Sequence, residues 1–347
     1  MTTPTRYALY AGVTVLGAGL LAGAVAYVTS TGAVVAQSGP DELRYVPVDA
    51  NLVAYANVRD VMASSFLARL RGLVPPASTD SSPSSGQERG PGPQWFQEAT
   101  GVDLETDIDY LVFSLVPGET DTDSPDPLGL MVGRFNAPRL QDLALEHGGT
   151  VQQYAEHVIV TGVATGDENE TQVAMSFVES GVLALGAEAL VRRAIDVSRG
   201  RVAGDVTTNE RLMRLMTQIR AGHNTWAVAE FEGVEAAQLL PEQMRAHVPP
   251  LTALALGGQV NGGVSTTLTV ETRDEQAAQD LHQVVQGLVA LARMQVTSYP
   301  ELQPFLESVQ LTGEGSTVTA TLDASGDLID VIFSTAAPDG LAAPGGP

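Results

Sequence analysis

The sequence predicts an α+β protein built from two structurally similar halves of mostly antiparallel sheet with covering helices, preceded by one N-terminal transmembrane helix. Three observations predict this architecture. Residues 7–28 form an uncharged apolar stretch, short glycine-containing turns join successive strand patterns, and one order of strands and helices occurs twice. We expect residues 41–200 to form the first half and residues 207–335 the second.

The N-terminal stretch sets the expected location of the protein. No charged side chain occurs between Arg6 and Asp41. As a helix with a rise of ~1.5 Å per residue, residues 7–28 span roughly 33 Å, about one hydrocarbon core. Because Arg6 and the free amino terminus favour the cytoplasmic side, we expect residues 1–6 to stay inside and the body to lie outside. A signal peptide removed after Ala36 and a buried helix are the alternatives.

Small residues gather on one face of this predicted membrane helix. Gly19 and Gly23 are four residues apart, and Ala18 and Ala22 lie beside them. Such a face lets two membrane helices approach closely, so Gly19 and Gly23 are the predicted helix-packing residues. The alternative is an unpaired anchor, since glycine is also common in membrane helices that have no partner.

The composition excludes several kinds of chemistry. The chain has 41 acidic and 18 basic residues, a net charge of −23, and no cysteine. A polyanion repels nucleic acids, so we expect no nucleic-acid partner. Every basic residue is arginine, which excludes a P-loop lysine and a Schiff-base lysine. Without cysteine, thiol nucleophiles, thiolate zinc sites and disulfides are also excluded.

The first half begins with a strand at residues 52–58 that is apolar on both faces and is therefore expected to be central. Asn57 is a predicted cap for a helix in which Met62 and Phe66 share one face. Residues 74–94 are rich in proline, serine and glycine and are predicted to be a disordered loop.

The rest of the first half alternates strands with short helices. The predicted strands are residues 107–116, 128–135, 158–163 and 172–186, the last a hairpin that turns at Glu179-Ser180-Gly181. A short helix follows Asn136, and a second occupies residues 188–198, before Gly200.

The second half repeats this order. A capping box of Thr207 and Glu210 predicts a helix start, and residues 225–231 read as a strand before a helix interrupted by Pro241. Strands at 251–260 and 264–272 turn at Asn261-Gly262-Gly263. A long helix capped by Thr272 and Glu275 follows, with an apolar stripe of Leu281, Val284, Val285, Leu288 and Leu291. Strands are predicted at 308–312 and 317–323, with a turn at Gly313-Glu314-Gly315. A short helix at 324–333 and a disordered tail at 336–347 end the chain.

Candidate chemical groups are few. Glu119, Asp121, Asp123 and Asp126 lie in one loop and are weak candidates for a hard cation such as calcium. The loop lacks the glycine and distal glutamate of the twelve-residue calcium loop, so a solvated acidic loop is the preferred interpretation. The five histidines show no metal-ligand spacing, and we predict no catalytic residue and no cofactor.

The opening of the body, "ELRYVPVDANLVAYANVRDVM" at residues 42–62, resembles the start of a group of uncharacterised exported bacterial proteins with an N-terminal apolar segment and an acidic body. No activity is known for that group. The resemblance implies a bacterial protein whose body lies in the periplasm or at the cell surface.

These features together predict a membrane-anchored extracytoplasmic binding or accessory protein, a non-catalytic subunit or interaction module that acts on a protein partner or a membrane complex. The alternative is a periplasmic carrier of a lipid or other apolar ligand, because antiparallel sheet covered by helices could enclose a pocket. A hydrolase that uses paired carboxylates has no residue spacing to support it.

Overall fold

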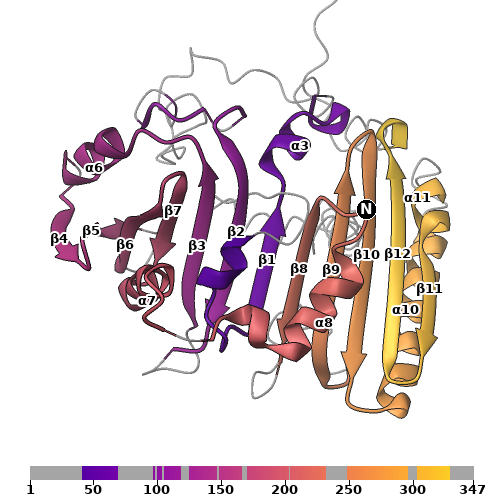
Figure 1. Ribbon diagram of the computed structural model, residues 1–347. Coiled ribbons are helices and arrows are strands. Elements are labelled where there is room, and N and C mark those ends of the chain that lie inside the picture. The colour runs from indigo at the N-terminus through magenta and orange to yellow at the C-terminus, as the bar shows by residue number, and fades with distance from the viewer. Residues whose placement is uncertain are drawn as a thin grey trace, which may run out of the picture.

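The computed structural model describes residues 41–68, 97, 100–103, 105–118, 125–146, 148–165, 170–202, 204–231, 248–295 and 303–328. These residues contain one twelve-stranded sheet in which all neighbouring strands are antiparallel (Figure 1). The strands are β1 (Leu52–Ala56), β2 (Ile108–Val116), β3 (Asp126–Gly133), β4 (Thr150–Tyr154), β5 (His157–Thr165), β6 (Glu170–Glu179), β7 (Val182–Gly186), β8 (Thr225–Glu230), β9 (Leu251–Val260), β10 (Gly263–Thr272), β11 (Gln310–Glu314) and β12 (Thr317–Ser325).

Across the sheet the strands lie in the order β11-β12-β10-β9-β8-β1-β2-β3-β7-β6-β5-β4. The helices and 3-10 turns are η2 (Asp41–Tyr45), α3 (Val58–Met62), α6 (Ala137–Glu146), α7 (Glu188–Ser198), η3 (Val206–Thr208), α8 (Glu210–Ile219), α10 (Glu275–Gln295) and α11 (Gln303–Ser308). The predicted α+β class with a large antiparallel sheet is confirmed.

The two parts of the chain join in the middle of the sheet. β1 pairs with β8 from Leu52 opposite Ala229 to Ala56 opposite Thr225. The rings of Tyr55 and Trp226 stack across this junction with centroids 4.9 Å apart. The strand at residues 52–56 is central because it is apolar on both faces, so each face can pack against a covering layer.

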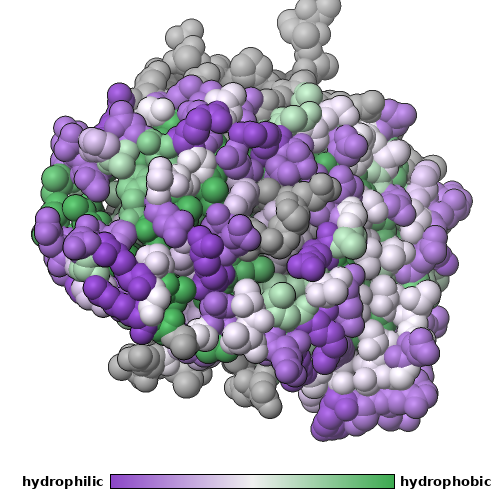
Figure 2. Space-filling view, in the orientation of Figure 1, coloured by the Kyte–Doolittle hydropathy of each residue, from purple (hydrophilic) through white to green (hydrophobic). Residues whose placement is uncertain are grey.

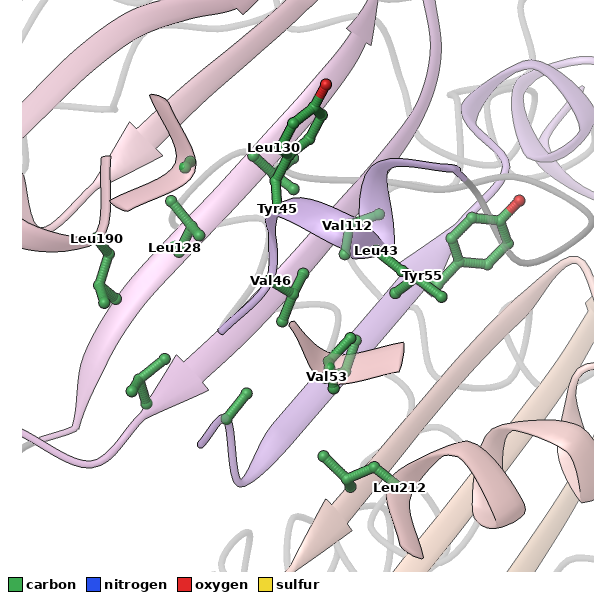
Figure 3. Close-up of a cluster of buried hydrophobic side chains, with 14 of the residues drawn as sticks. Leu43, Tyr45, Val46, Val53, Tyr55, Val112, Leu128, Leu130, Leu190 and Leu212 are labelled. Atoms are coloured by element: carbon green, nitrogen blue, oxygen red, sulfur yellow. The ribbon is translucent and has the colours of Figure 1, made fainter. Parts of the chain in front are cut away.

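One face of the sheet carries the main hydrophobic core, which α7, α8 and η2 cover (Figure 1). Leu128, Ile195 and Leu212 are fully buried there, one each from β3, α7 and α8. In Figure 3, Tyr45 and Val46 extend among side chains of β1, β2 and β3. This core holds α7, α8 and η2 against the central strands of the sheet.

On the opposite face the clusters are smaller. Val58 of α3 and Leu140 of α6 pack near β2, and Phe305 and Leu306 of α11 pack near β12. In Figure 1, α10 and α11 lie behind β12 and β11. The long helix therefore covers the outer strands from the side away from the main core.

The predicted alternation along β10 is present. Thr266 and Val270 are buried on the side of α10, together with half-buried Val264 and Leu268. The other side of β10 carries Ser265, Thr267, Thr269 and Glu271, whose cross-strand partners on β12 are also mostly polar. Figure 2 shows mainly hydrophilic residues over this outer part of the sheet.

Two predicted helix caps were wrong. α8 is capped by Asn209, whose Oδ1 accepts from the amides of Arg211 and Leu212, because Thr207 is already in η3 under Asp205. α10 is capped by Asp274, whose Oδ1 accepts from the amide of Ala277 at 2.9 Å. Thr272 cannot take that role, since its hydroxyl contacts the backbone carbonyls of Asp274 and Ser316.

One strand and one α-helix were not predicted from the sequence, and one turn was misplaced. β4 has no alternating apolar pattern, because it is an edge strand with exposed residues from Thr150 to Gln153. The helix α11 at residues 303–308 was not predicted. The strand expected at residues 308–312 is β11, which begins after this helix. The β11–β12 turn lies at Gly315-Ser316, one to two residues later than predicted.

Several predictions fall on residues outside the described ones. They are the cytoplasmic residues 1–6, the membrane segment 7–28, the loop at 74–94, the helix interrupted by Pro241, and the tail at 336–347. Among the helices that the structure does describe, none combines the length and apolar character needed to cross a bilayer.

Asn209→Ala should lower the free energy of unfolding by about 1 kcal/mol, because it leaves two amides of the first turn of α8 without an acceptor. Thr207→Ala is the matched control and should have a smaller effect. Urea unfolding followed by circular dichroism measures both. A loss for Thr207→Ala equal to or above that for Asn209→Ala would contradict the observed cap.

Candidate ligand-binding cavity

The candidate site lies beneath α10. This helix is held against the sheet at its start, where Ala278 and Leu281 pack with Val270 of β10 and Val318 of β12. The Asp274 carboxylate caps the same end through the amide of Ala277. The sequence favours this contact because small alanines at 277 and 278 let the backbone of the helix approach the strands.

The far end of α10 is held separately. Ala292 packs against the cluster of Phe305, Leu306 and Ala324, which joins α11 to β12. The guanidinium of Arg293 donates to the carbonyl oxygen of Leu306 at 3.4 Å. Thus α10 has a packed contact near each end, the first of which extends to half-buried Val285, and the rest of its middle spans the strands between them.

The middle of α10 is not tightly packed. Val284, Val285 and Val289 point towards the sheet but are only half-buried. Gly287 faces away from the strands, and a Cβ built on it would meet nothing within 4 Å. A helix interior that packed directly on the sheet would bury such valines, so this span leaves a space beneath it.

That space is a cavity of about 180 Å³ between α10, α11 and strands β9 to β12. Its walls are almost entirely aliphatic, with one aromatic ring. The lining residues are Val248, Leu251, Leu254, Leu256, Thr266, Leu268, Val270, Leu281, Val284, Val285, Val289, Ala292, Phe305, Leu306, Val309, Leu311, Val318, Ala320, Thr321 and Leu322. None of these side chains is charged, so the cavity suits an uncharged, apolar group.

The volume of the cavity can be compared with that of a known apolar cavity. An engineered apolar cavity of about 150 Å³ in another protein stays free of water and binds benzene. The cavity under α10 is slightly larger and is also lined mainly by apolar side chains, here mostly leucine and valine. It can therefore hold an apolar group of about six carbon atoms without bound water.

The strongest shifts of pKa occur elsewhere, on the face of the main core. Burial raises the pKa of Tyr45 to about 12, with the Glu179 carboxylate as a smaller cause. Burial also raises the pKa of Tyr110, which donates to the carboxylate of Glu42. Both tyrosines stay protonated at neutral pH. The hydroxyl of Tyr110 donates to Glu42 and ties η2 to the sheet, whereas that of Tyr45 accepts from Arg44 at 2.8 Å.

The predicted acidic site is not brought together among the described residues. Asp126 begins β3 and pairs with Val116 of β2, whereas Glu119, Asp121 and Asp123 lie outside the part that the structure describes. Within the described ranges, no group of three histidine, aspartate or glutamate side chains could hold a metal ion. Gly19 and Gly23 also lie outside the described residues.

The three described histidines take part in local hydrogen bonds. His157 Nδ1 contacts the carbonyl oxygen of Phe177 at 2.9 Å, and His223 Nδ1 contacts that of Ile219 at 2.5 Å. His282 Nε2 contacts the side chain of Gln286 on the same helix at 2.7 Å. The contact of His157 joins β5 to β6, that of His223 joins the following turn to the end of α8, and that of His282 lies within α10.

The apolar stripe of the long helix predicted one wall of the cavity, and the other walls were not predicted. Leu281, Val284 and Val285 line it as part of the predicted stripe. Leu291 was expected on that stripe but is 52% exposed, because it lies about 80° round the helix from Leu281, on the side opposite to Val289. The alternation of apolar and polar residues along β10 predicts that one face of this strand is packed. This pattern is the same for a cavity and for a filled core.

Comparisons with known proteins give a likeness of fold. No protein-family profile matches the chain, and no curated protein matches it. Crystal form III of a protein named TP0453 is similar over 85% of this chain and 99% of that one, with 9% identity and a TM-score of 0.49. Crystal form I covers 86% and 98%, with 10% identity and a TM-score of 0.46. Neither likeness assigns an activity or a residue role to this chain.

Gly287→Ala should raise the free energy of unfolding by about 0.5–1 kcal/mol, because alanine is the better helix former and its Cβ enters open space. Gly257→Ala on β9 is the contrasting variant and should destabilise the protein. Its Cβ would lie 2.7 Å from ring atoms of His223 and 2.8 Å from Ile219. Thermal unfolding measures both, and a loss of stability in Gly287→Ala would show that α10 is packed differently.

Proposed function

We propose that the protein is a membrane-anchored extracytoplasmic binding protein whose ligand is a lipid or another molecule with an apolar chain. The observation that carries the proposal is the cavity of about 180 Å³ beneath α10, with its uncharged aliphatic walls. Apolar pockets with few polar groups are typical of small-molecule sites. The packed contacts at both ends of α10 keep this pocket preformed.

The size of the cavity limits how tightly it can bind. About six methylene-sized groups at ~0.8 kcal/mol each give a gross gain of ~5 kcal/mol. This corresponds to a dissociation constant on the order of 10⁻⁴ M before the costs of association. A lipid would therefore place one part of a chain in the cavity, and the rest of the ligand would lie outside it.

The anchor and the repeat of the fold belong to the same proposal. Residues 7–28 would hold the body at the outer surface of the membrane, which is the source of a lipid ligand. Outward from the central pair, β1-β2-β3-β7 corresponds to β8-β9-β10-β12, with α6 and α10 at corresponding places in the chain. This correspondence supports two structurally similar halves, of which the second carries the cavity.

The proposed role is binding and not catalysis. The hydroxyl groups of Thr266 and Thr321 are the only side-chain functional groups among the lining residues. Neither has a described base or acid beside it in the lining, so the cavity offers contact to a ligand and no proton transfer. A protein partner or membrane complex that receives the ligand would fit this role as an accessory subunit.

A photoreactive fatty acid with a diazirine at its chain end tests the proposal. The full chain in lipid nanodiscs should be labelled within α10 and within β9 to β12, as well as in residues 7–28, because the chain end enters the cavity. Peptide mass spectrometry locates the label. Labelling confined to residues 7–28 would contradict the proposal.

Val289→Phe should reduce the labelling of α10 and the strands roughly tenfold or more, since a loss of ~1.4 kcal/mol is already a tenfold change. Its ring would occupy the space that Val289 now borders. Leu291→Phe is the matched control, because Leu291 lies two residues away on the same helix and is exposed. Equal labelling of the two variants would argue against a ligand in the cavity.

A further inference from the structure

One wall of the cavity carries a buried hydroxyl group that has no partner. Thr266 is only 8% exposed, lines the cavity, and its Oγ1 makes no hydrogen bond with the described residues. A buried hydroxyl without a partner is unfavourable, and native structures rarely keep one without a reason. The question is what this hydroxyl could bind.

Other threonines of the same part of the sheet do have partners. Thr225 Oγ1 donates to the carbonyl oxygen of Gly258 at 2.9 Å, and Thr272 Oγ1 donates to that of Ser316 at 2.9 Å. Thr269 Oγ1 lies 3.3 Å from Thr319 Oγ1 on the polar side of the sheet. A hydroxyl on these strands can thus be satisfied within the protein, and Thr266 is an exception.

The neighbours of Thr266 explain the exception. Across the ladder it lies opposite Gly258 of β9 and Leu322 of β12, so neither cross-strand neighbour offers a polar side chain. Along β10, Val264 and Leu268 flank it on the same face. Gly258 has no side chain, and this leaves Thr266 bordered on one side by backbone alone.

Thr321 does not supply the missing partner. Along β12 it alternates with Ala320 and Leu322, and its cross-strand partner is Thr267, which lies on the polar side of the sheet. The side chain of Thr321 therefore points away from the cavity, which it lines through its backbone. Of the two threonines that line the cavity, Thr266 is therefore the one whose hydroxyl group lies on the cavity side of the sheet.

We propose that the cavity selects a neutral amphiphile, an aliphatic ligand whose hydroxyl or ester oxygen hydrogen-bonds to Thr266 Oγ1. This inference rests on the proposed function and names the chemical class of its ligand. A threonine hydroxyl can both donate and accept, so it matches an alcohol or an ester carbonyl. An ionised head group is excluded from this position, because the lining has no charged side chain to compensate it.

The test compares two ligands of the same length and different polarity. 1-Hexanol and n-heptane have the same number of non-hydrogen atoms, and each competes with the photoreactive fatty acid for the full chain in nanodiscs. Wild-type protein should be protected by hexanol at a roughly tenfold lower membrane concentration than by heptane, the effect of one buried hydrogen bond.

Thr266→Val keeps the shape of the side chain and removes the hydroxyl. In this variant hexanol should lose its advantage and protect no better than heptane, and protection by heptane should be unchanged from wild type. Thr266→Ser should restore most of the preference for hexanol. Unfolding temperatures of both variants report that the fold is kept, and Thr321→Val should retain the wild-type preference.

The outcomes separate this inference from the proposed function. Labelling of α10 and the strands with equal protection by the two ligands in wild type would overturn the role of Thr266 alone. A preference for hexanol that persists in Thr266→Val would do the same. No labelling of the cavity in wild type would overturn the proposed function and this inference together.

Discussion

The packing of α10 against the rest of the protein at two separate points is the constraint on which the candidate site depends. Ala278 and Leu281 pack at one end, and Ala292 packs against the α11 cluster at the other. Between them the helix spans the strands, and Val284 and Val289 stay half-buried beside the cavity. The cavity lies between these fixed ends, and the other side of β10 and β12 carries polar side chains.

A space of this kind has a cost, because its lining side chains lose van der Waals contacts that a filled core would supply. Proteins close such spaces readily by substituting larger residues. Here Ala292 and Ala320 remain small, and Thr266 adds a hydroxyl without a partner. An aliphatic ligand with one polar oxygen would satisfy both deficits, and an anchor at residues 7–28 would keep the protein near such ligands.

Periodicity predicted the elements more reliably than their relations. The apolar pattern placed α7, β9 and β10 close to their observed bounds and α10 at its observed start, because helices and strands of that length carry clear periods. The predicted helix caps were wrong where several polar residues near the start of a helix could act as the cap. Asn209, and not Thr207, caps α8. The cavity could not be predicted, because its depth depends on contacts between Ala278 and Val318 and between Ala292 and Phe305, which are distant in sequence.

Crystals of the full-length chain exposed to xenon under pressure would test the central claim directly, because xenon enters empty apolar cavities of this size. We predict a xenon atom beneath the middle of α10, in contact with Leu268, Val289 and Ala320. Electron density without xenon at this position, with Val289 packed directly onto Leu268, would contradict a preformed ligand cavity.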